Sequence, residues 1–325
     1  MQDVDVVSLI SLVLWGGFAA GVLFGAVAQH THFCTMGALS DLVTMGDDTR
    51  LRMWVLAIAV AMLGFNGMAA MGLVDAVDTV YARPQLIWLS NLVGGALFGF
   101  GMVLASGCGS KTLVRIGGGS LKSLVVFFVL GVAAYATLRG LTAVWRVETI
   151  DRIAVELPAG QDLVSLAAHA VGGERPALSA VLGGVLGLAM LAWVLARPQG
   201  RDATTLLGGV GVGAAVVIGW WVTGSIGFVA EHPETLEETF LATNSRSMES
   251  LTFVAPVAYT LDWLILYSDT SKVLTFGIVS VLGVIVRSAA MALASGRLRG
   301  AACVRSPSLP AKKNPCLSWS EHRTQ

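Results

Sequence analysis

Long apolar runs dominate the chain and alternate with short polar connections. A helix that crosses a bilayer needs about 20 mostly apolar residues, because the hydrocarbon core is about 30 Å thick. The hydrophobicity within these runs is continuous rather than alternating, which favours helices over barrel strands. The pattern therefore predicts an all-α polytopic membrane protein with seven long transmembrane helices, at Val7–Ala28, Met53–Val74, Leu86–Ala105, Leu121–Val144, Leu178–Ala196, Leu206–Phe228 and Val273–Ala294.

Three further stretches are apolar but too short to cross a bilayer. Helix-breaking residues interrupt them, including the glycines on either side of Cys108. Irregular backbone at membrane depth is tolerated only where it faces protein or a water-filled cavity. Broken helices of this kind direct their N-termini at anionic substrates in transporters. We therefore predict short re-entrant half-helices and a small anionic substrate, with the half-helices at His30–Asp41, Ala105–Ile116 and Ser250–Leu264.

The composition supports lipid as the main solvent. Of 325 residues, 55% are hydrophobic and 13% are charged, against roughly 25% charged in an ordinary soluble domain. The mean hydropathy is +0.73. Lysine plus arginine and aspartate plus glutamate both number 21, so bulk positive charge for nucleic-acid binding is excluded. Four cysteines in so long a chain are too few for a disulfide framework.

Basic residues mark one side of the membrane. They follow the first, third, fifth and seventh predicted spans, whereas the opposite connections are acidic, and cytoplasmic loops are the basic ones. We therefore expect a multi-pass membrane protein with its N-terminus outside and a cytoplasmic C-terminal tail. The N-terminus is acidic, so no cleavable signal peptide is expected. The segment 147–177 mixes charged and apolar residues and is expected to lie at the outer interface.

Two cysteines lie in the short segments. Cys108 is either a pore-lining thiol or a small buried residue in a close helix contact. For Cys34 the second interpretation, a small buried residue, is the stronger one. Its neighbours His30 and His32 suggest metal binding only weakly, because side chains two positions apart point in different directions on a helix. We favour interfacial histidines and no metal site.

Charged and polar residues in apolar segments are the next candidates. Lys111 and Arg115 are four residues apart, so they share one face of a short helix. They are either cytoplasmic anchors, which we favour, or a vestibule that attracts anions. Asn66 and Asn91 are expected to form interhelical hydrogen bonds, and Asp262 is notable as a carboxylate in an apolar stretch.

Two motifs resemble the YeeE/YedE family of bacterial inner-membrane proteins, which includes the thiosulfate transporter. The first is Phe33-Cys34. The second, more specific, is Gly99-Phe100-Gly101-Met102-Val103-Leu104-Ala105-Ser106-Gly107-Cys108-Gly109, followed by Arg115-Ile116-Gly117-Gly118-Gly119-Ser120-Leu121. The likeness covers roughly residues 8–299.

The resemblance implies two inverted halves of four long and two short helices, joined by a bridging helix, around a waist lined by cysteines. On this plan residues 1–146 form the first repeat, 147–177 an extracytoplasmic connector and 178–203 the bridging helix with its loop. Residues 204–299 form part of a second repeat, and 300–325 a polar tail. The first inverted repeat is complete and the second incomplete, because a second Gly-Cys span is not found. We assign no role to Cys303 and Cys316.

The function implied by the resemblance is transport of small sulfur-containing anions, thiosulfate first, along cysteine thiols. Cys108 and Cys34, with Gly107 and Gly109, would line the path. No cofactor and no enzymatic activity are expected. A cytoplasmic sulfur-carrier protein is considered as a partner. The alternatives are a membrane thiol protein that handles sulfane sulfur or selenium, and an inactive truncated paralogue or scaffold subunit.

Overall fold

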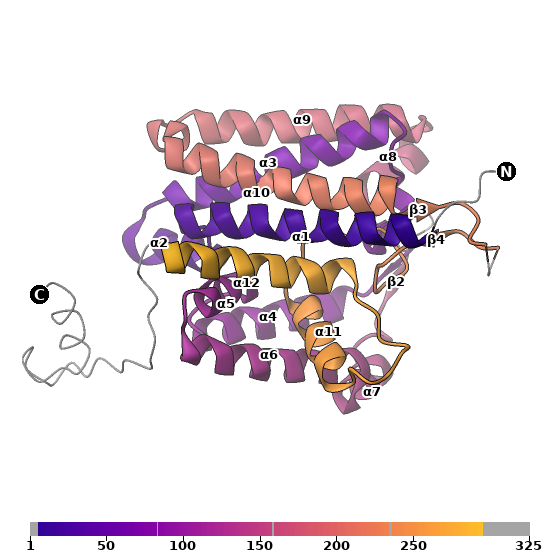
Figure 1. Cartoon of the computed structure of the whole chain (residues 1–325). Helices are drawn as coiled ribbons and strands as arrows, with labels where there is room; N and C mark the ends of the chain where they lie inside the picture. Colours follow the sequence, from indigo (N-terminus) through magenta and orange to yellow (C-terminus); the bar gives the residue numbers. More distant parts are fainter. Residues whose placement is uncertain (1–5, 83, 158, 234–235, 295–325) are drawn as a thin grey trace, which may run out of the picture.

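The computed structural model describes residues 6–82, 84–157, 159–233 and 236–294. Seven helices in it are long and apolar enough to cross a membrane, which confirms the all-α polytopic fold. Figure 1 shows most of them lying side by side along one direction. Their main helices are α1 (Val6–Thr31), α3 (Thr49–Ala70), α4 (Trp88–Leu104), α6 (Leu121–Arg139), α9 (Arg175–Leu195), α10 (Ala203–Trp221) and α12 (Phe276–Ala294). The spans that begin with α1, α4 and α10 run on to Met45, Gly117 and Ile226.

All three predicted short segments contain a separate short helix. The helices are α2 (Thr35–Met45), α5 (Gly109–Gly117) and α11 (Val254–Ile265). In Figure 1, α2 lies at one end of the bundle, and α11 is tilted against the long helices. Each short helix follows a non-helical stretch of backbone. Its first N–H groups therefore have no preceding helical turn to which they can donate.

The connections hold the remaining elements. Two short helices, α7 (Leu141–Glu148) and α8 (Leu163–Val171), lie before α9. The sequence pattern did not indicate two antiparallel strand pairs. The first, β1 (Gln85–Leu86) with β2 (Val155–Glu156), joins two distant connections. The second, β3 (Phe228–Val229) with β4 (Thr239–Phe240), lies within the connection between α10 and α11. The 3₁₀ turns are η1 (Ala76–Asp78), η2 (Val80–Ala82) and η3 (Pro198–Arg201), and a π turn, η4 (Val222–Ile226), extends α10.

One predicted span has the wrong boundary. The apolar run Leu121–Val144 is not a single helix, because α6 ends at Arg139 and α7 begins at Leu141. Gly140 between them is extended, with φ −98° and ψ −161°. A Cβ atom on Gly140 would lie 2.8 Å from backbone atoms of Ala136. The chain turns there because glycine alone leaves room for this close approach.

Glycines set the tightest helix contact. Gly17, Gly21 and Gly25 of α1 face α12, and a Cβ atom on Gly21 would lie 2.2 Å from the carbonyl oxygen of Ser280. The four-residue spacing places the three glycines on one helix face, which lets two backbones approach closely. The same device recurs between α10 and α3, where Gly209 abuts the Leu56 side chain.

Polar side chains join α3 to α9. The Ser179 hydroxyl donates to Asn66 Oδ1 at 2.8 Å, which confirms the interhelical hydrogen bond predicted for Asn66. At the other end of α3 the buried Arg52 side chain bonds Asp48 and the backbone oxygen of Trp193 at 2.7 Å. Its guanidinium also lies 4.3 Å from the centre of the Trp193 ring. A buried cation is tolerated here because oxygens and an aromatic face surround it.

Helix α4 differs from the other long helices. Within the described part of the chain none of its 17 residues is buried. Asn91, for which we predicted an interhelical hydrogen bond, has no side-chain partner among the described residues. The predicted cytoplasmic tail 300–325, with Cys303 and Cys316, lies outside the described residues.

Candidate functional site

The two cysteine-containing breaks share one backbone geometry. His32, directly after α1, has φ 54°, and Ser106, two residues after the end of α4, has φ 55°. At each break, the backbone N–H of the following residue donates to the carbonyl oxygen five residues earlier. Phe33 N donates to Ala28 O at 3.2 Å, and Gly107 N donates to Met102 O at 3.0 Å. This is the Schellman ending of a helix. The left-handed residue is therefore a histidine or a serine, not one of the glycines beside Cys108 that the sequence suggested as helix breakers.

After each break a cysteine starts the next helix. Cys34 is extended (φ −162°, ψ 123°) and is the N-cap of α2, where its sulfur accepts the N–H of Gly37 at 3.4 Å. Cys108 is also extended (φ −78°, ψ 173°) and is the N-cap of α5. Both thiols are free. An N-cap side chain normally accepts a hydrogen bond from the first turn. Cys34 does so, whereas Cys108 makes no capping hydrogen bond with its side chain.

The fold brings the two thiols together. Cys34 and Cys108 interact side chain to side chain, although they are far apart in the sequence. The backbone N–H groups of Lys111 in α5 and Thr35 in α2 lie near the Cys108 sulfur. It lies 3.2 Å from the Ser110 hydroxyl. The first turns of both half-helices therefore converge on one sulfur atom.

A third half-helix abuts this pair. A Cβ atom on Gly109 would lie 3.5 Å from the Cβ of Phe253 and 3.8 Å from a methyl of Val254, so the N-terminus of α11 meets that of α5. The Phe253 ring is 4.7 Å from that of Phe24, and Phe24 is 6.5 Å from Phe33. Helix N-termini carry partial positive charge. Three such termini beside an aromatic cluster suit a soft, negatively charged solute.

The two basic residues of α5 have different surroundings. Lys111 is half-buried, and its stem covers the Cα of Gly107, where a Cβ would be 3.0 Å away. It has no ion pair among the described residues, and its charge acts on the Cys34 thiol. Arg115 is exposed and donates to the backbone oxygen of Ser106 at 3.0 Å, which ties α5 to the break before it.

Some contributors were not singled out from the sequence. Thr35 and Ser110 lie beside the Cys108 sulfur, and Phe253 belongs to the third helix N-terminus. Their positions in the sequence could have pointed to them, because Ser110 is two residues after Cys108 and Thr35 is next to Cys34. Sequence spacing alone could not show that two distant segments supply donors to the same sulfur.

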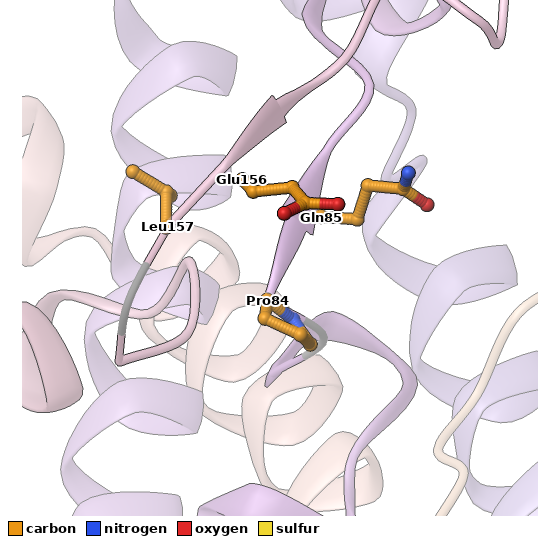
Figure 2. A pocket seen from close by; sticks show the side chains of 4 residues that line it. All are labelled: Pro84, Gln85, Glu156 and Leu157. Carbon is orange, nitrogen blue, oxygen red and sulfur yellow. The ribbon is translucent and has the colours of Figure 1, made fainter.

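Other polar features fit an anion site less well. Figure 2 shows a surface pocket lined by Pro84, Gln85, Glu156 and Leu157, beside the β1–β2 pair. Its carboxylate repels anions. Among the described residues no three histidine, cysteine or acidic side chains lie close enough together to hold a metal ion.

Asp262 is paired. Its carboxylate accepts a hydrogen bond from Lys272 Nζ at 2.6 Å. This hydrogen bond raises the pKa of Lys272, which lies in the connection after α11. The pair ties that connection to α11, and Asp262 is therefore not a free carboxylate in an apolar stretch.

Seven long apolar helices and broken helices whose N-termini meet at a thiol pair define a polytopic membrane protein built like a transporter. The chain belongs to the Sulphur transport family, whose model matches residues 30–311.

Two relatives named thiosulfate transporter TsuA are similar to this chain. One, from Escherichia coli, is 26% identical over 295 residues, which is 90% of this chain and 78% of the relative. The other, from Spirochaeta thermophila, is 31% identical over 171 residues, or 53% of this chain. The matched region spans 48% of that relative's length, about half of it. A shorter stretch of 97 residues is 28% identical to the probable transporter YedE of Escherichia coli.

Proposed function

We propose that this protein transports small sulfur-containing anions across the membrane, with thiosulfate as the first candidate. The family and the names of the relatives support this substrate class. The observation that carries the proposal is the convergence of α2 and α5 on the sulfur of Cys108. A site rich in N–H donors and soft sulfur atoms suits an anion that ends in sulfur.

In this proposal Cys108 is the main contact and Cys34 the second. The terminal sulfur of thiosulfate accepts S–H hydrogen bonds, so the two thiols can hold the anion in turn. Gly107 and Gly109 keep side chains out of the path. Lys111, which lacks an ion pair among the described residues, supplies the attractive field together with Arg115.

The proposed topology follows the basic loops, with the N-terminus outside and the C-terminal tail in the cytoplasm of a bacterial inner membrane. Cys34 and Cys108 follow the ends of α1 and α4, which on this topology are their cytoplasmic ends. The thiol pair therefore lies toward the cytoplasm, where a sulfur-carrier protein would receive the substrate.

The test is uptake of ³⁵S-thiosulfate by cells that lack their other sulfur importers. We expect Cys108→Ala to abolish uptake and Cys34→Ala to reduce it, because the first change removes the sulfur at which the half-helices meet. Cys316→Ala removes a thiol to which no role is assigned, so it is the matched control and should transport normally. Normal uptake by a well-expressed Cys108→Ala variant would contradict the mechanism.

Replacing Lys111 separates electrostatics from thiol chemistry. Lys111→Gln should raise the thiosulfate concentration needed for half-maximal uptake, and Lys111→Arg should largely restore it, because the charge is retained. Added salt should weaken uptake by the wild type more than by Lys111→Gln. Equal salt dependence of the two proteins would argue against a role for this charge.

A further inference from the structure

Beyond passage of an intact anion, we propose that Cys108 accepts the sulfane sulfur of its substrate and becomes a persulfide. This inference rests on the proposed function for the substrate class and adds a covalent step to the same site. It follows from the surroundings of the Cys108 sulfur, which differ from those of Cys34.

Cys108 has the donors that a charged sulfur needs. Its sulfur is surrounded by the N–H groups of Thr35 and Lys111, the hydroxyl of Ser110 and the thiol of Cys34. These donors come from two helices whose positive ends meet there. Hydrogen bonds from several fixed donors suit a thiolate, which is the nucleophilic form of cysteine. Cys108 is also only partly buried, unlike Cys34.

Cys34 is the less suitable nucleophile of the two. It is buried, with 6% of its surface exposed, and its own helix gives its sulfur the Gly37 N–H. Its position beside Cys108 makes it a donor toward the charged sulfur, both before and after the reaction. Cys34 is therefore a positioning residue, and Cys108 is the acceptor.

The step balances without any further reactant. The Cys108 thiolate attacks the outer sulfur of thiosulfate, a new S–S bond forms to Cys108, and the S–S bond within thiosulfate breaks. The bonding electron pair leaves with sulfite. One thiolate and one thiosulfate dianion give one persulfide anion and one sulfite dianion, so atoms and charge are conserved, and attack by sulfite reverses the step.

The new terminal sulfur also has a counter-ion at hand. The persulfide extends the side chain by one negatively charged sulfur, and the Lys111 ammonium, unpaired among the described residues, is a neighbour of the cysteine pair. The donors around Cys108 and the charge of Lys111 thus stabilise the product as well as the reactant.

The experiment uses the purified full chain in lipid nanodiscs with thiosulfate labelled by ³⁵S in either its outer or its inner position. We expect the outer label to stay on the protein through a non-reducing denaturing gel and to leave on treatment with dithiothreitol. The inner label should appear as free sulfite in equal amount. Mass spectrometry should place one added sulfur atom on Cys108.

Three variants complete the test. Cys108→Ser should lose both the bound label and the sulfite. Cys34→Ser should keep the label on Cys108 but form the persulfide more slowly. Cys316→Ser should behave as the wild type. The size-exclusion profile and thermal unfolding of each variant show whether it folds.

Two results would overturn the persulfide proposal: no retained outer label on a folded wild type, or an added sulfur located on Cys34. Proteoliposomes that take up thiosulfate labelled in both positions, while the protein itself stays unlabelled, would leave transport standing and remove only the covalent step. Loss of uptake together with retained labelling would instead contradict the transport proposal.

Discussion

Replacing Gly21 by alanine tests whether the close packing of α1 on α12 holds the bundle together. The added methyl group would lie 2.2 Å from the carbonyl oxygen of Ser280 and 2.9 Å from its Cα. Both are backbone atoms of a helix, so no side chain can rotate out of the way. The two helices must separate or slide.

The size of the effect follows from that distance. An ordinary van der Waals contact of a Cβ atom begins at 3.4 Å, so the methyl group is too close by about 1.2 Å. Overpacking of a well-packed contact costs about 1–3 kcal/mol. For a domain of this size we expect the unfolding temperature to fall by roughly 2–12 °C, using about 2–4 °C for each kcal/mol.

The assay is thermal unfolding in detergent, followed by tryptophan fluorescence. Gly95→Ala in α4 is the matched control, because it makes the same change in a long helix where nothing lies within 4 Å of the new Cβ atom. Alanine favours a helix over glycine by up to about 1 kcal/mol, so this control should be unchanged or more stable. Equal unfolding temperatures for Gly21→Ala and Gly95→Ala would refute the reasoning.

Three further predictions concern polar contacts. Asn66→Ala and Ser179→Ala should each lower the unfolding temperature, and a double-mutant cycle should give a coupling of about 0.6–1.7 kcal/mol; additive effects would show that the hydrogen bond contributes nothing. The hydrogen bond from Arg52 lowers the pKa of Asp48. The Asp48 carboxylate therefore stabilises the fold at neutral pH, and this contribution is lost as the pH falls below about 4. Asp48→Asn should therefore be less stable than the wild type at pH 7 and equal to it in acid, as measured by unfolding temperature across pH; a difference that persists in acid would contradict this. Lys272→Gln removes the ion pair with Asp262, so limited proteolysis should cut the connection after α11 faster, and an unchanged rate would show that the pair does not restrain it.

The candidate site was predicted only in part from the sequence. A broken helix was predicted at Cys108, although the left-handed residue there is Ser106 and not one of the flanking glycines. The short length of the segment indicated a half-helix. The contact of Cys108 with Cys34 could not be predicted, because two short segments far apart in the chain meet only when α1, α5 and α12 pack. The inverted repeats, the orientation of the termini and the path residues stay predictions.

The sequence by itself determined the membrane fold. A bilayer requires long apolar runs with internally bonded backbone, so run length alone fixed the number of spans. Hydropathy could not show the turn at Gly140, because the apolar run continues through it and the break depends on a close approach of backbone atoms. Tertiary structure also decided which donors surround the Cys108 sulfur. Hydropathy is a property of each segment, whereas a site made of several helix N-termini is a property of how the segments pack.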